Sequence, residues 1–188
     1  QMSLIKDKFQ YYNDLYDIYH DYERMNNIKT INDNAGIQPV KVDEEIIELL
    51  KLGITMDEKT DGNMNIAMGT VLSIWHDYRE AGSEDPYSAE LPPMDELERP
   101  AEHPDIHNIV IDEEASTVYL TDPDMLWDVG SIGKGYAVQK VAEYAKNELG
   151  IQYMLFSVGG NVCAIGGHPD GSTWAVGIQN PDVESDQA

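Results

Sequence analysis

Apolar side chains in the first part of the chain recur at the spacing of amphipathic helices. They repeat at steps of three or four residues from Ile5 to Tyr19, which predicts a helix over residues 3–22. A second apolar set follows Asp43, a residue type that caps helix N-termini, and it predicts a helix that reaches Lys59. The opening of the chain is therefore expected to be helical.

The helical pattern continues and then gives way to a loop rich in proline. A third helix is expected to begin near residue 69 and to run through residue 75. Residues 81–105 hold five prolines, which predicts a loop around a short helix at residues 94–99. Residues 1–105 are thus expected to form a mainly helical part.

After residue 105 the pattern changes to short apolar runs separated by turn residues, which is typical of strands. Residues 131–149 return to helical spacing, and Gly150 stands where a helix-ending glycine is expected. The predicted strands are Ile109–Ile111 with Val118–Leu120 as a hairpin, then Tyr153–Val158, Val162–Ile165 and Trp174–Ile178. We expect one α+β domain, with a helical N-terminal layer packed on a mixed or antiparallel sheet that is contributed by the α/β part, residues 106–188.

The charge of the chain narrows the classes of partner. Its 35 Asp and Glu residues outnumber its 12 Lys and Arg, for a net charge of −23 at pH 7. Nucleic acids and anionic membrane surfaces are bound by clustered cations, so this composition argues against both. Cys163 is the single cysteine, which excludes an intrachain disulfide and a cysteine-based zinc site. No apolar run approaches the roughly 20 residues that span a bilayer.

The segment from Trp127 to Ala137 has the most chemical content. Asp128 ends an apolar run, three glycines follow within a few positions, and Lys134 stands where a helix is expected to begin. Glycines allow close approach to the backbone, and a helix N-terminus offers free N–H groups to an anion such as a diphosphate. A tight strand-to-helix turn whose glycines serve packing explains the same spacing, and the sequence leaves both interpretations open.

Two other glycine-containing stretches are compatible with ordinary turns. Residues 157–161, Ser-Val-Gly-Gly-Asn, fit a β-hairpin, and residues 60–65, Thr-Asp-Gly-Asn-Met-Asn, fit a helix-to-helix connection whose amides could also contact a flavin or purine ring. His103 and His107 have the spacing of metal ligands on a helix, but Pro104 between them makes a shared helical face doubtful. Asp122-Pro123-Asp124 is interpreted as a turn.

Taken together, these stretches resemble the ApbE family, the FAD:protein FMN transferases. The resemblance is carried by the order of four segments: Lys59–Gly69 ending at Trp75, Asp128–Ala137, Ser157–Asn161 and Trp174–Pro181. It implies that FAD binds with a divalent metal, usually Mg²⁺, at its diphosphate. FMN is then transferred through a phosphoester to a Thr or Ser of an acceptor flavoprotein, and AMP is released.

The resemblance also implies roles for individual residues. By position, the FAD contacts are Tyr19, Asn63, Met64, Asn65, Asp128 and Lys134, and Ser131 lends an oxygen to the metal. No residue is identified as catalytic. The family often has an aspartate in the flavin loop where this chain has Asn65, which can form hydrogen bonds but carries no charge. The family's later metal-binding segments and its first segment are expected outside these 188 residues, so the chain is expected to be incomplete at both ends.

Partners and location are implied in the same way. The resemblance implies an extracytoplasmic protein tethered to the membrane through an N-terminal anchor that this chain lacks. The expectation of no nucleic-acid partner comes from the acidic charge. Two other hypotheses remain open. One is a non-catalytic FAD-binding protein with the same pocket, and the other is an acidic interaction module that keeps the fold without the ligand.

Overall fold

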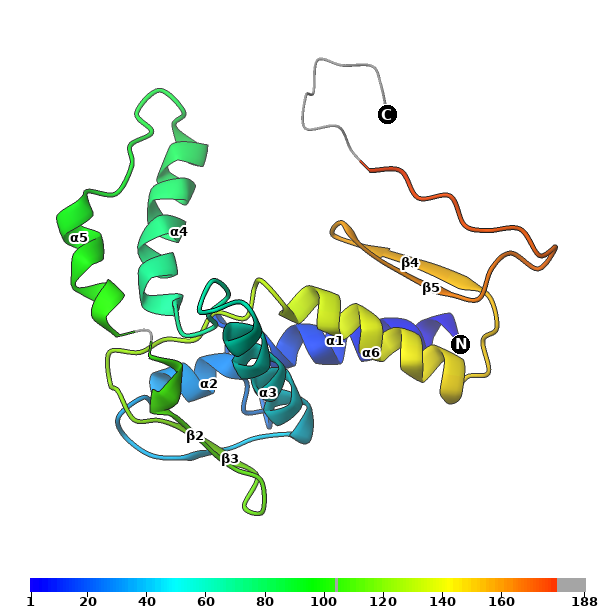
Figure 1. Cartoon of the computed structure of the whole chain (residues 1–188), viewed down its shortest axis with the longest axis horizontal. Coiled ribbons are helices and arrows are strands. Elements are labelled where there is room, and N and C mark those ends of the chain that lie inside the picture. Colours follow the sequence, from blue (N-terminus) through cyan, green and yellow to red (C-terminus); the bar gives the residue numbers. More distant parts are fainter. Residues whose placement is uncertain (104, 179–188) are drawn as a thin grey trace.

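The computed structural model describes residues 1–103 and 105–178 of the chain (Figure 1). Its helices are α1 (Met2–Leu15), α2 (Ile28–Asp33), α3 (Glu44–Lys59), α4 (Gly69–Glu84), α5 (Met94–Glu98) and α6 (Gly133–Asn147), with short 3-10 turns η1 (Pro100–Glu102) and η2 (Ile106–Asn108). None of these helices combines the length and the hydropathy that a membrane-spanning segment needs.

The strands of the described residues form two small antiparallel sheets. The first has the order β1-β3-β2, with β1 (Val40–Lys41), β2 (Ile109–Asp112) and β3 (Thr117–Leu120). In its register, Val118 lies opposite both Val40 and Ile111. The second sheet is the hairpin of β4 (Met154–Val158) and β5 (Asn161–Ile165). Because β1 pairs with β3, the mainly helical part and the α/β part share one sheet.

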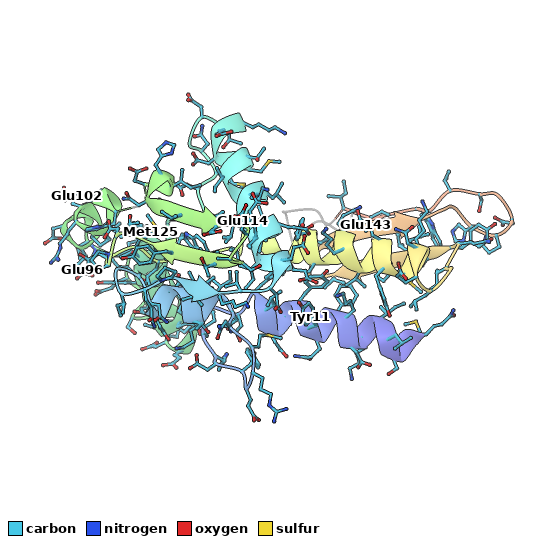
Figure 2. All side chains as sticks on the ribbon, turned by 90° about the horizontal axis from the view of Figure 1, so that it is seen from below. Tyr11, Glu96, Glu102, Glu114, Met125 and Glu143 are labelled. Carbon is cyan, nitrogen blue, oxygen red and sulfur yellow. The ribbon has the colours of Figure 1, made fainter. Side chains whose placement is uncertain are left out.

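One hydrophobic core joins the helices to both sheets. α6 packs against α1 on one side and against β4 and β5 on the other, and Figure 2 shows α1 running along α6. The rings of Phe9 in α1 and Phe156 in β4 meet edge to face, 6.0 Å apart. The largest fully buried side chains are Leu15, Ile28, Ile31, Ile46, Leu49, Leu50, Ile66, Val118, Leu120, Met125, Trp127 and Val138. The α4–α5 hairpin projects away from this core in Figure 1.

Several elements lie where the sequence predicts them, and the α+β class is confirmed. α3 follows Asp43 and ends at Lys59, and the hairpin of β2 and β3 spans the predicted residues. Gly53 sits inside α3 because a Cβ there would lie 2.6 Å from the buried Ile66 side chain. Gly150 follows α6 with a φ of +67°, the left-handed conformation that glycine adopts most readily.

Other predictions were wrong, two in a helix boundary and one in the existence of a strand. The helix expected over residues 3–22 ends at Leu15, because the Asp17 carboxylate accepts hydrogen bonds from the Tyr19 and His20 N–H groups and turns the chain. α6 begins at Gly133 rather than at residue 131. Residues 174–178 form no strand with the described residues, since the apolar alternation there finds no partner strand among them. The Gln179–Pro181 end of the fourth family segment lies outside the described residues.

Candidate functional site

The first two sequence motifs run side by side in the structure. The Asp128 N–H donates to the Ile66 carbonyl at 2.9 Å, and the Gly69 N–H donates to the Leu126 carbonyl at 2.9 Å. A Cβ on Gly69 would lie 2.5 Å from that Leu126 oxygen, so only glycine allows this approach. The backbone around residues 66–69 therefore fixes the position of Asp128.

A side chain from α2 fixes the same segment from the other side. The Asn32 amide nitrogen donates to the Trp127 carbonyl at 3.0 Å, and the Asn32 side-chain oxygen accepts from the Trp127 N–H at 2.8 Å. One side chain thus satisfies both backbone groups of a fully buried residue, as a neighbouring strand would. Asp128 therefore follows a buried segment whose backbone is hydrogen-bonded on one side to residues 66–69 and on the other side to Asn32.

The turn after Asp128 places Lys134 at the start of α6. The Asp128 carboxylate accepts the Gly130 N–H at 2.7 Å, and the Val129 carbonyl accepts from the N–H groups of residues 132 and 133. Lys134 lies in the first helical turn with an exposed side chain. Its Cδ lies 3.8 Å from where a Cβ on Gly159 would stand, in the β4–β5 turn. The second and third motifs therefore meet at the N-terminus of α6.

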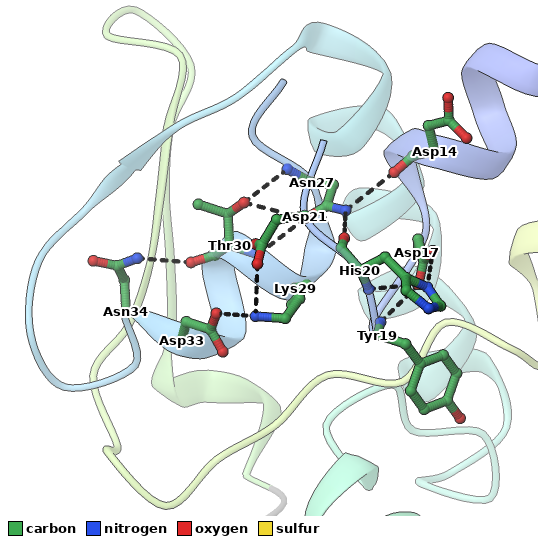
Figure 3. Close-up of polar contacts among 10 residues, drawn as sticks. All are labelled: Asp14, Asp17, Tyr19, His20, Asp21, Asn27, Lys29, Thr30, Asp33 and Asn34. Atoms are coloured by element: carbon green, nitrogen blue, oxygen red, sulfur yellow. Dashed lines mark hydrogen bonds and ion pairs between the residues drawn. The ribbon is translucent and has the colours of Figure 1, made fainter. Parts of the chain in front are cut away.

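Tyr19 lies in the loop between α1 and α2, which a buried asparagine organises (Figure 3). Asn27 caps α2 by accepting the Thr30 N–H at 3.0 Å, and its amide donates to the carbonyls of Asp14 and His20. Burial opposes the ionisation of Asp17, but hydrogen bonds from Tyr19, Tyr22 and His20 outweigh it and lower the pKa of that carboxyl. The loop that carries Tyr19 is thus set by local polar contacts.

These elements enclose a pocket of about 900 Å³, within the range of small-molecule sites. Its wall combines aromatic side chains with three of the chain's 12 cations, Lys6, Arg79 and Lys134. The lining residues are Lys6, Phe9, Gln10, Tyr12, Asn13, Tyr16, Asp17, Ile18, Tyr19, His20, Arg79, Asp128, Val129, Gly130, Gly133, Lys134, Ala137 and Val158. A ring system with an attached anion matches this combination of surfaces.

A second pocket of about 540 Å³ adjoins the first along α4. Tyr19, Arg79 and Asp128 line both pockets. The rest of the smaller wall is Leu72, Trp75, His76, Tyr78, Gly82, Ala89, Glu90 and Leu91, so it is also rich in aromatic and apolar side chains. Two aromatic pockets therefore meet at one tyrosine, one cation and one carboxylate.

The structure brings together three of the residues that the sequence singles out. Tyr19, Asp128 and Lys134 line the larger pocket, whereas Asn63, Met64, Asn65 and Ser131 line neither. Asn63 donates to the Thr60 carbonyl at 2.6 Å, and Asn65 accepts the Ala67 N–H at 2.7 Å, so both shape the loop between α3 and α4. The Met64 N–H donates to the Thr60 hydroxyl oxygen in the same loop. Ser131 is exposed in the turn before α6.

Sequence reasoning missed Arg79 and His76. They lie three residues apart on α4, with Arg79 Nη2 2.7 Å from His76 Nδ1. The sequence signal for them is weak: they share one face of α4 with Leu72 and Trp75 at helical steps, and this face is exposed except for the half-buried His76. From sequence alone, an Arg and a His on a helix surface cannot be distinguished from polar side chains that only contact solvent.

The cations of the pocket differ in their partners. Arg79 also lies 3.3 Å from Glu80, on an exposed face of α4. Lys134 forms no hydrogen bond or ion pair with any described residue, although acids outnumber bases almost threefold in the chain. Because no carboxylate of the described residues pairs with Lys134, its positive charge is available to an anion in the pocket.

Potential metal ligands gather elsewhere. Within residues 1–103 and 105–178, the group of three or more His, Cys, Asp or Glu side chains with suitable spacing is His103, Asp122 and Asp124. His103 Nδ1 lies 2.9 Å from an Asp122 oxygen, and its Nε2 lies 3.8 Å from an Asp124 oxygen. His103 and Asp122 are partly buried there, and the His103 contact holds the pKa of the Asp122 carboxyl below its usual range. Ser131, the ligand implied by the resemblance, is not in this group.

Comparisons with known proteins point to one family. The ApbE family profile matches residues 2–188. The FAD:protein FMN transferase of Klebsiella pneumoniae is 27% identical over 158 residues, which are 84% of this chain and 46% of that protein. The Escherichia coli K12 protein of the same name is 25% identical over 162 residues, which are 85% of this chain and 44% of that protein.

Solved structures agree in fold. The ApbE protein of Thermotoga maritima superposes with a TM-score of 0.78 at 25% identity, covering 98% of this chain and 56% of that one. The flavin transferase ApbE of Vibrio cholerae gives 0.77 at 21% identity, covering 96% and 55%. The chain spans about half the length of the curated relatives it matches.

Proposed function

Because the chain belongs to the ApbE family, we propose that it supplies the FAD-binding part of an FAD:protein FMN transferase. The hydroxyl oxygen of an acceptor Ser or Thr attacks the flavin-side phosphorus of FAD. The bond between that phosphorus and the bridging oxygen breaks, and AMP leaves with the bridging oxygen. FMN stays on the acceptor through a new phosphoester, and the hydroxyl proton is released.

The observation that supports this proposal most strongly is Lys134. This side chain lines a pocket of about 900 Å³. It has no carboxylate partner among the described residues, although the chain has a net charge of −23. A lysine at a helix N-terminus faces an anion with both its own charge and the free N–H groups of the helix. The FAD diphosphate is the anion that fits the family and the aromatic walls around it.

Other residues of the pocket fit the uncharged parts of FAD. Phe9 and Tyr16, both half-buried on the pocket wall, present aromatic surface to a flavin ring, and the buried Tyr12 ring packs behind them in the core. The Asp128 carboxylate keeps acceptor capacity beyond its bond to the Gly130 N–H, and a ribityl hydroxyl or a ring N–H would satisfy it. Tyr19 stands between the two pockets, where a ligand that fills both would pass.

The proposal includes Mg²⁺ at the diphosphate, with Ser131 as an oxygen ligand. Mg²⁺ prefers about six oxygen ligands in an octahedral shell. Ser131 supplies one oxygen, and the described residues do not assemble a complete site around it. The proposal also includes an acceptor flavoprotein with a Ser or Thr site and an extracytoplasmic, membrane-tethered location, both implied by the family resemblance.

An intact-mass assay tests the proposed activity. The chain, and in parallel a version extended to the length of its relatives, is incubated with FAD, Mg²⁺ and a tagged acceptor that bears Asp-Gly-Ala-Thr. We expect the acceptor to gain the mass of one FMN, Asp128→Asn to abolish the gain, and the exposed α4 variant Asp77→Asn to retain it. No gain with either version would contradict the transferase, and FAD binding without transfer would favour the non-catalytic binder.

A further inference from the structure

Arg79 occupies the junction of the two pockets. It lines both of them, together with Tyr19 and Asp128, and 67% of its side-chain surface is exposed to solvent. Burial raises the pKa of Tyr19, Asp128 raises it further, and Arg79 lowers it, so both charges act on the same phenol. Arg79 is thus a cation on the wall that the two pockets share, where a ligand that fills both would pass.

His76 holds Arg79 in this position. The guanidinium group can only donate, so the contact of 2.7 Å from Nη2 makes His76 Nδ1 the acceptor and places the proton of the neutral ring on Nε2. The His76 ring in turn packs against the Tyr19 ring, with centroids 5.3 Å apart and a 33° angle between the planes. The Tyr19 hydroxyl lies 3.5 Å from the same Nδ1. Three side chains from α4 and the Tyr19 loop therefore form one contact chain.

An ordinary surface role for Arg79 explains less of this geometry. Its contact with Glu80 joins two neighbours on an exposed face, and such pairs contribute little to stability. An Arg79–Glu80 pair could form anywhere on the exposed face of α4. It accounts neither for the contact of Arg79 with His76 nor for the position of Arg79 at the pocket junction.

We propose that Arg79 binds the diphosphate of a flavin dinucleotide at the junction of the two pockets, with His76 as its positioning residue. The proposal rests on the proposed function. A dinucleotide has two ring systems joined by an anionic centre, and the two pockets offer aromatic walls on either side of one arginine. Lys134, at the start of α6, supplies a further cation on the wall of the larger pocket. Arginine suits this role because its planar fork matches phosphate oxygens in two-point contacts.

A panel of three ligands tests this assignment. FAD and riboflavin binding are measured by flavin fluorescence, and ADP binding by calorimetry, for the wild type and for Arg79→Gln, Arg79→Lys and the control Arg99→Gln. We expect Arg79→Gln to weaken FAD and ADP about 10- to 100-fold and to leave riboflavin, which lacks phosphate, within about twofold. Arg79→Lys is expected to lose less, and Arg99→Gln to bind all three ligands as the wild type does.

The positioning role of His76 has its own readout. We expect His76→Asn to weaken FAD and to spare riboflavin, and the double variant with Arg79→Gln to be no weaker than Arg79→Gln alone, because both changes remove one interaction. Unchanged FAD affinity in Arg79→Gln, or an equal loss of riboflavin, would overturn the assignment. If the wild type binds neither FAD nor ADP, the proposed function itself fails, and this outcome is distinct from a failure of Arg79 alone.

Discussion

Adding one methyl group at Gly69 should disturb both the fold and the candidate site. In Gly69→Ala the new Cβ would stand 2.5 Å from the Leu126 oxygen, 2.7 Å from the Leu126 carbonyl carbon and 2.9 Å from the Trp127 carbonyl carbon. All three are backbone atoms, so no side chain can rotate away. The two segments must separate by at least about 0.5 Å to bring that oxygen beyond 3.0 Å.

The size of the effect follows from what this separation strains. The Gly69 N–H to Leu126 bond and the Asp128 N–H to Ile66 bond, each 2.9 Å long, both cross the gap that widens. Overpacking at a rigid contact and weakening of these bonds together should cost about 2–4 kcal/mol of the free energy of unfolding. Because the displaced segment carries Asp128, FAD affinity should fall as well.

Urea denaturation followed by tryptophan fluorescence measures the effect, since Trp127 is fully buried beside the contact. We expect the midpoint to fall by about 1 M or more. Gly82→Ala is the matched control in the same helix, because its Cβ meets only Ala89, at 3.1 Å, and gains helix propensity. Its stability should stay within about 1 kcal/mol of the wild type. A Gly69→Ala protein within about 0.5 kcal/mol of the wild type would refute the reasoning.

Three further predictions concern the supports of the site. Asn32→Ala should lower the free energy of unfolding by about 2–4 kcal/mol in urea titration, because both backbone groups of Trp127 lose their partner; a loss below about 0.5 kcal/mol would contradict this. Asn27→Ala should cost a similar amount, about 2–4 kcal/mol, by removing a fully buried cap and two carbonyl contacts, and an unchanged melting curve would count against it. A hydrogen bond from Lys140 lowers the pKa of Glu48 from its ordinary value of 4.5, so that pair stabilises the fold above this pH, and the stabilisation is lost as pH falls through the folded pKa. Glu48→Gln should therefore flatten the loss of stability as pH falls below 4.5 in acid titration, and an unchanged slope would contradict the assignment.

Elements fixed by local sequence were predictable. The helical spacing after Asp43, the turn glycine at Gly150 and the two strands around the Gly159-Gly160 turn each act within a few residues, so the sequence alone indicates them. Elements that depend on a distant partner were not. β1 has only two residues and exists because Val40 pairs with Val118, and residues 174–178 form no strand because the described residues offer no neighbour.

The site divides in the same way. The Asp128 and Lys134 positions follow from a dense motif whose glycines allow close backbone approach, and the structure places both at one pocket. Arg79 and His76 escape sequence reasoning because their meaning depends on the fold of the Tyr19 loop, which in turn depends on the buried Asn27. The ligand-binding roles of all the residues that the sequence singles out rest on family resemblance and stay predictions: Tyr19, Asn63, Met64, Asn65, Asp128, Lys134 and Ser131.

The central claim is that FAD binds in the joined pockets bounded by Tyr19, Asp128 and Lys134. A crystal structure of the chain with FAD tests it most directly. The account predicts flavin density against the aromatic wall of the larger pocket and a diphosphate within hydrogen-bond distance of Lys134 and Arg79. Density for FAD on another face of the molecule, with these side chains unengaged, would contradict it.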